Sequence, residues 1–107
     1  MRNRAAGEGR GRRVDGLTDT TGAGSPTGRG SVPARSSRRW FTFNWPEWEL
    51  VDWRMLPTSV RPGAPQLSWR VALERAAGNF LTYWITVTNL TDQDVAFEGR
   101  YCVLGRI

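Results

Sequence analysis

The densest group of acidic side chains in this sequence surrounds a tryptophan. Glu47, Glu49 and Asp52 flank Trp48 within a few residues. Two carboxylates can serve as general acid and general base, as they do in glycoside hydrolysis. Enzymes of that kind normally need a cleft much larger than a chain of this length forms. We therefore do not expect glycosidase activity from this cluster.

Three further groups of side chains are of types that can do chemistry. Cys102 is the only cysteine and has Arg100 as the one cation on its side of a predicted strand, so we expect a small, partly buried hydrophobic side chain. Asp92 and Asp94 fall in a predicted turn, but the oxygen cage that Ca²⁺ requires is not visible around them. Glu98 and Arg100 are expected to form a surface ion pair.

The residue types that the chain lacks exclude several classes of enzyme. The 107 residues include no histidine and no lysine. Without histidine the chain has neither the commonest general base nor the commonest metal ligand. Without lysine it cannot perform Schiff-base chemistry or form a P-loop, and one cysteine cannot build a disulfide within the chain or a Cys-rich zinc site. We expect a non-enzymatic protein with no catalytic residue, metal site or cofactor.

The elements that would position these side chains are strands, because hydrophobic residues alternate with polar ones in the second half of the chain. Residues 66–74, 80–88 and 95–104 each place apolar side chains on one face and polar ones on the other, as half-buried strands require. Residues 76–79 form a hairpin connection, and residues 89–94 have the composition of a turn. Gly99 within the last strand predicts a bulge or a close approach of neighbouring backbone.

The first half of the folded region is less regular. Residues 40–45 read as a strand ended by Pro46, and residues 48–56 read as a second strand. Residues 57–65 hold three prolines and a glycine, which predicts a long, stiff loop. The chain is therefore predicted to be all-β, a small antiparallel β-sandwich or meander of about five strands in residues 40–107.

The aromatic side chains exceed what one face of such a sheet can bury. Alternation assigns a common inner face to Trp53, Trp69, Tyr83, Phe97 and Tyr101. The remainder comprises Trp40 and Trp45 near the start of the domain and an outward set of Trp48, Leu50, Phe80 and Trp84. A second sheet could bury some of these, but two exposed indoles would forgo several kcal/mol, comparable to the stability of a small domain. We predict that the outward set forms an interface with another copy or a different protein.

The segment 1–39 differs from the rest in composition and charge. It holds nine of the fifteen arginines, three acids and no aromatic residue, so it is strongly basic, whereas residues 40–107 are slightly acidic. Such a composition predicts a disordered or extended arm. Its arginines could bind phosphates or an acidic surface. The alternatives are a solvated tail without a partner and translated upstream sequence. The candidate binding residues are Arg10, Arg12, Arg13, Arg38 and Arg39.

Three functions compete on these grounds. The first is a structural or interaction module that self-associates or docks on a larger assembly, such as a virion, tail or filament. The second is a carbohydrate-binding module that stacks a sugar on an exposed tryptophan, with Thr82, Thr86 and Thr88 supplying hydrogen bonds. The third is a nucleic-acid-binding protein, which the slightly acidic domain disfavours.

The sequence shows no secretory signal or membrane segment, so we expect no membrane partner and a cytoplasmic or assembly-bound location. We discount the glycosylation pattern at Asn89–Thr91.

Overall fold

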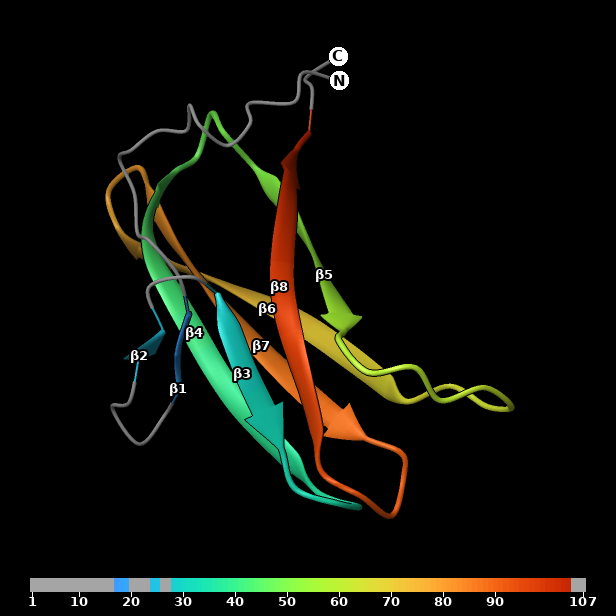
Figure 1. Cartoon of the computed structure of the whole chain (residues 1–107). Coiled ribbons are helices and arrows are strands. Elements are labelled where there is room, and N and C mark those ends of the chain that lie inside the picture. Colours follow the sequence, from blue (N-terminus) through green and yellow to red (C-terminus); the bar gives the residue numbers. More distant parts are fainter. Residues whose placement is uncertain (1–16, 20–23, 26–27, 105–107) are drawn as a thin grey trace.

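A computed structural model describes residues 17–19, 24–25 and 28–104 (Figure 1). The described residues form strands and turns without a helix, which confirms the predicted all-β class. It follows that no described helix could cross a membrane. The strands are β1 (Leu17–Asp19), β2 (Gly24–Ser25), β3 (Arg29–Val32), β4 (Ser37–Pro46), β5 (Val51–Pro57), β6 (Leu67–Ala77), β7 (Phe80–Asn89) and β8 (Val95–Val103).

Two antiparallel sheets stack to form a sandwich. The larger sheet has five strands in the order β2-β1-β4-β7-β6, and the smaller has three in the order β3-β8-β5. Figure 1 shows β3, β8 and β5 as one layer lying across β4, β7 and β6. In each sheet the spatial order of the strands differs from their order along the chain, so the fold is a sandwich and not a simple meander. The interior lies between the two layers.

The last five strands correspond closely to the predicted ones. β6 and β7 form a hairpin with Ala77 paired to Phe80, and Gly78 occupies its first central position with a φ of 51°. The loop 58–66 between β5 and β6 is tied to the start of β8, because Thr58 N donates to Ala96 O at 3.1 Å. Gly99 N donates to Gly28 O at 2.6 Å, the close backbone approach expected from a glycine within a strand.

The folded region begins earlier than the sequence predicted. Residues 29–39 were assigned to the arm, yet β3 pairs with β8 and β4 begins at Ser37. Val32 is fully buried. Gly30 is required by packing, since a Cβ there would lie 2.8 Å from the Trp40 ring and 2.9 Å from the Phe97 ring. A glycine that composition counts toward disorder is here the residue that lets β3 close over two aromatic rings.

The core combines aromatic and aliphatic side chains from both sheets. Trp40 and Trp45, which the sequence left among the unassigned aromatics, are only 3% and 2% exposed. The Trp45 ring contacts Trp53, Tyr83 and Tyr101 edge to face, with centroids 5.1–6.0 Å apart. The expected inner residues Trp53, Tyr83 and Phe97 are buried, and Trp69 and Tyr101 pack against them half-buried.

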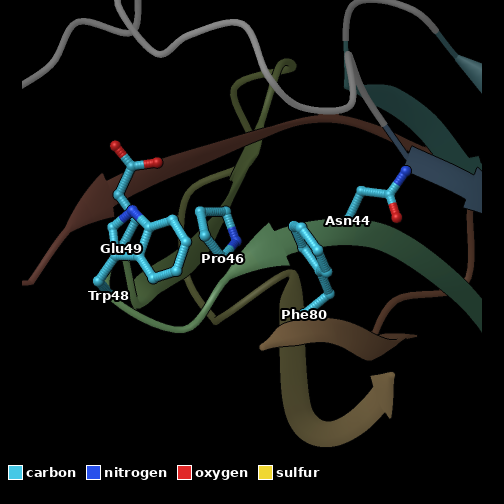
Figure 2. Close-up of a pocket in the computed structure, with 5 residues that line it drawn as sticks. All are labelled: Asn44, Pro46, Trp48, Glu49 and Phe80. Carbon is cyan, nitrogen blue, oxygen red and sulfur yellow. The ribbon is translucent and has the colours of Figure 1, made fainter. Parts of the chain in front are cut away.

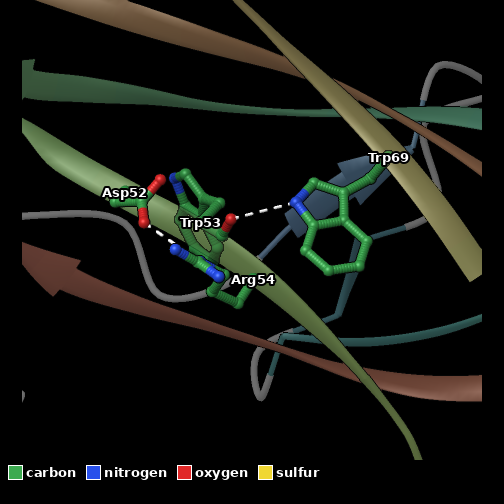
Figure 3. Close-up of polar contacts among 4 residues, drawn as sticks. All are labelled: Asp52, Trp53, Arg54 and Trp69. Atoms are coloured by element: carbon green, nitrogen blue, oxygen red, sulfur yellow. Dashed lines mark hydrogen bonds and ion pairs between the residues drawn. The ribbon is translucent and has the colours of Figure 1, made fainter.

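Two hydrogen bonds join the sheets across this interior. The Tyr83 hydroxyl of β7 accepts from Val51 N of β5 at 2.9 Å, in buried surroundings. The Trp69 indole of β6 donates to Trp53 O of β5 at 3.1 Å (Figure 3). Because buried polar groups destabilise a fold when unpaired, these bonds fix the two layers in one relative position.

The turn between β7 and β8 is organised by a buried amide. Asn89 is 1% exposed, and its side-chain nitrogen donates to Val32 O at 2.9 Å and to Gln93 O at 2.7 Å. Its oxygen accepts from Thr91 N at 2.8 Å. The side-chain nitrogen that a glycan would modify is thus buried inside the fold. The residues that match the glycosylation pattern therefore have a structural role here, which is to organise this turn.

Tyr83→Phe is predicted to lower the free energy of unfolding by about 1–3 kcal/mol, because Val51 N would lose its buried acceptor. Burial raises the pKa of Tyr83 above its ordinary value, against the smaller, opposing effect of the hydrogen bond from Val51. A raised pKa means stability that is complete below pH 10 and lost as the pH rises through the folded-state pKa. Urea unfolding between pH 7 and 11 should show a weaker alkaline loss in Tyr83→Phe. Tyr101→Phe, with a half-buried ring, is the control; equal effects in both would contradict the assignment.

Candidate interaction surface

A bulge in β4 decides which aromatic rings face outward. Thr42 pairs with Tyr83 and Trp45 pairs with Leu81, so two residues of β4 stand opposite one residue of β7. Asn44 takes a φ of 66°, a left-handed conformation that asparagine tolerates better than most residues. Without the extra residue, Trp40 and Trp45 would lie on opposite faces, because five positions separate them.

The bulge leaves an aromatic cluster on the outer face of the larger sheet. Phe41 and Phe43 of β4 lie beside Phe80 and Trp84 of β7; we call these four residues the outer aromatic surface. Phe43 and Phe80 are 43% and 44% exposed. The four rings line an open hollow of about 360 Å³, together with Asn44, Glu74, Ala76, Ala77 and Thr82. No other described strand covers this side of the sheet.

Trp84 is held in place from three directions. Its indole N–H donates to the Glu74 carboxylate at 2.7 Å. The Arg39 guanidinium lies 5.0 Å from the ring centroid, and the Phe41 ring lies 5.2 Å away at 32°. The indole is therefore half-buried and fixed before any partner arrives, and its ring is already in contact with a cation and an aromatic neighbour.

Trp48 extends the aromatic region around the end of β4. It is 60% exposed and shares an open hollow of about 500 Å³ with Asn44, Pro46, Glu49 and Phe80. Figure 2 shows the Trp48 indole on one side of Pro46 and the Phe80 ring on the other. A third hollow, about 460 Å³, connects Trp48 with Leu50 at the open end of the sandwich.

The four residues singled out from the sequence as an interface thus occupy a continuous band. Trp84 and Phe80 line one hollow, Phe80 and Trp48 line the next, and Trp48 and Leu50 line the third. Sequence reasoning missed Phe41 and Phe43. Asn44, placed between Phe43 and Trp45 within a strand, was the available signal, because asparagine in a strand interior favours a bulge.

Two residues expected on the inner face are exposed. Val71 and Leu73 of β6 are 37% and 52% exposed, although neighbouring Leu67 is buried. They point to the inner side, but β6 is the edge of the five-stranded sheet and the three-stranded sheet does not cover its second half. Alternation predicted their direction correctly and their burial wrongly.

The acidic side chains around Trp48 are engaged separately. Glu47 pairs with Arg75 at 2.6 Å, and Asp52 accepts from Arg54 at 3.1 Å (Figure 3). The predicted pair of Glu98 and Arg100 is present at 3.3 Å. Within residues 28–104 no three acidic or thiol side chains converge in a way that could hold a metal ion.

Of the five arginines proposed to bind phosphate, the structure describes two, and it does not bring these two together. Arg10, Arg12 and Arg13 lie outside the described residues. Arg38 donates to Ser31 O at 3.0 Å and lies near the buried Trp40 ring, whereas Arg39 lies over Trp84 on the outer face. Neighbouring positions on a strand point to opposite faces, so these two cannot grip one phosphate.

No protein-family model, curated protein or solved structure matches this chain. Its function must therefore be inferred from the arrangement of the described side chains. The arrangement that offers a partner the most aromatic side chains is the band of partly exposed aromatic residues from Trp84 to Trp48.

Asn44→Val is predicted to destabilise the protein by about 1–2 kcal/mol, because a β-branched residue strongly disfavours a positive φ. Asn44→Gly should be neutral or slightly stabilising, since glycine adopts that conformation freely. Urea unfolding measures both free energies. Asn79→Ala in the β6–β7 hairpin is the control, because Asn79 is exposed and does not have a positive φ. Equal stability of the Val and Gly variants would contradict a bulge at this site.

Proposed function

We propose that this chain is a non-enzymatic assembly protein that binds other protein molecules, first of all further copies of itself, through its outer aromatic surface. One observation carries the proposal: four aromatic rings from two adjacent strands lie together on a sheet face that no other described strand covers. Contiguous apolar patches of this kind mark interaction sites more often than ordinary surface.

The chemistry of this surface suits a protein partner. Aromatic side chains dominate the well-packed centres of protein interfaces, and a polar rim surrounds them. Here the rings of Phe43 and Phe80 occupy the exposed positions, and Glu74 and Arg39 lie at the margin of the cluster. Trp84 is already fixed by its hydrogen bond to Glu74, so binding would cost little side-chain entropy there.

The test is the mass of the full-length chain in solution. Sedimentation velocity at micromolar concentration should give a mass above the 12.1 kDa of one chain. Phe43→Ser with Phe80→Ser should reduce that mass with only a moderate loss of stability, because 43% and 44% of the surface of these two residues is already exposed. Val60→Ser, at a residue that is 92% exposed in the loop before β6, is the matched control. An unchanged mass in the double variant would refute self-association through this surface.

A second function, saccharide binding, is favoured by one arrangement. Trp48 presents an open indole beside the Asn44 amide and the Glu49 carboxylate, and sugars bind to aromatic rings flanked by such polar groups. Trp84 suits this role poorly because Arg39 and Phe41 already contact its ring. The threonine row is partly engaged as well, since Thr88 bonds to Ser37 at 2.7 Å.

Titration of the full chain with a panel of neutral oligosaccharides, followed by tryptophan fluorescence, tests this alternative. A sugar that stacks on Trp48 should change the emission, and Trp48→Ala should abolish the change while Phe80→Ala, across Pro46 in the same hollow, only weakens it. Absence of any response across the panel, or a response that survives Trp48→Ala, would eliminate saccharide binding at this site.

A further inference from the structure

One edge of the larger sheet is the long strand β6, whose outer side is unpaired among the described residues. β6 bonds to β7 on one side and has no described neighbour on the other. All residues of β6 from Arg70 to the end of the strand are exposed. Its pairing with β7 is regular from Leu67 to Arg75, and the only irregularity follows Arg75. Natural edge strands are protected by shortness, bulges, proline or charged side chains; this segment is long, regular and free of proline, and its protection is limited to the charges of Arg70, Glu74 and Arg75.

The backbone groups available along this edge follow from the ladder on the opposite side. Leu90 N donates to Gln66 O, so Gln66 and Leu90 are a hydrogen-bonded pair. Such pairs alternate along an antiparallel ladder, so Ser68, Arg70, Ala72 and Glu74 direct their N–H and C=O groups to β7. Trp69, Val71, Leu73 and Arg75 direct theirs to the open edge.

We propose that two copies of this chain pair through β6, antiparallel, with a two-fold axis at Ala72. In a symmetric antiparallel pair each residue faces the one equally far from the axis on the other copy. Arg70 then stands opposite Glu74, Val71 opposite Leu73, and Trp69 opposite Arg75. The five-stranded sheets become one continuous sheet, and the interface adjoins the outer aromatic surface at Glu74 without including its four rings.

Charge complementarity selects this register. The residues whose backbone groups point to the open edge must pair with one another. The two-fold axis therefore passes through a residue and not between two residues, and alternative registers differ by moving the axis from one residue to another. An axis at Arg70 or at Glu74 sets like charges against each other, and an axis at Val71 or at Leu73 leaves Arg70 facing an alanine. Only the axis at Ala72 matches Arg70 with Glu74, and among the described residues Arg70 forms no ion pair within its own chain.

The remaining contacts agree with this pairing. Val71 and Leu73 are apolar, are exposed in a single chain and would cover each other on the inner side. With Val71 and Leu73 as hydrogen-bonded pairs, Arg70 and Glu74 become non-hydrogen-bonded pairs, in which side chains approach more closely. β5, an edge strand of the smaller sheet, is less exposed than β6 and is partly covered, since the Trp69 indole bonds to Trp53 O (Figure 3).

Charge reversal tests the register on the full chain. Arg70→Glu should weaken dimerisation about tenfold or more, because it replaces two attractions with two repulsions in the symmetric pair. Arg70→Glu combined with Glu74→Arg should restore it. Arg54→Glu on β5, also an exposed arginine on an edge strand, is the matched control and should leave the mass unchanged. An unchanged mass for Arg70→Glu, or a failure of the double variant to recover, would overturn the proposal.

A cross-linking experiment gives an independent result should Glu74→Arg disturb Trp84. In a Cys102→Ser background, Ala72→Cys places two thiols across the axis, and mild oxidation should join the two chains. Ala76→Cys, which would face Ser68 of the other copy, should not cross-link. Cross-linking of both variants to the same extent, or of neither, would exclude this register.

Sedimentation distinguishes this interface from the outer aromatic surface. If both interfaces are present, the variant Phe43→Ser with Phe80→Ser should still form the dimer paired through β6. The variant Arg70→Glu should still form the species held together by the outer aromatic surface. If the aromatic surface does not self-associate, the wild type is a dimer that only Arg70→Glu dissociates. If the β6 pairing is wrong, only the aromatic variant lowers the mass.

Discussion

The bulge at Phe43 and Asn44 is the constraint on which the rest of this structure depends. It inserts one residue into β4, so that Trp40, Thr42 and Trp45 all face the interior despite their odd spacing. Phe41 and Phe43 alternate with Trp40 and Thr42 and therefore lie on the outer face beside Phe80 and Trp84. Without the insertion Trp45 would share that outer face, so one backbone irregularity moves Trp45 into the core, and the left-handed conformation of Asn44 makes it possible.

The rigidity of the outer aromatic surface comes from contacts on both sides of the sheet. Beneath it, Trp45 packs edge to face on three aromatic rings, and Tyr83 and Trp69 bond to the backbone of the facing sheet. Above it, Glu74 and Arg39 fix the Trp84 ring. A surface held in this way loses little freedom on binding, which favours recognition of a protein by preformed shape.

The unequal sizes of the two sheets explain what remains exposed. A three-stranded layer cannot cover a five-stranded one, so the second half of β6 has no facing partner and Val71 and Leu73 are accessible. Glu74 connects this edge with the outer aromatic surface, because it lies on β6 and holds Trp84 on β7. In a sheet continued across β6, the two aromatic surfaces would face the same side, since the two-fold axis is perpendicular to the sheet.

The sequence by itself determined the all-β class, the positions of the last five strands and the outward direction of Trp48, Leu50 and Phe80, because alternation and turn residues act locally. Only the tertiary structure decided the rest. β3 is a strand because Gly30 fits against Trp40 and Phe97, a contact between distant residues that composition does not report. Trp45 joined the core and left the face of Phe41 and Phe43 because a bulge reversed the alternation between Thr42 and Trp45. Val71 and Leu73 stayed exposed because burial depends on which strands lie opposite, and alternation specifies faces without specifying neighbours.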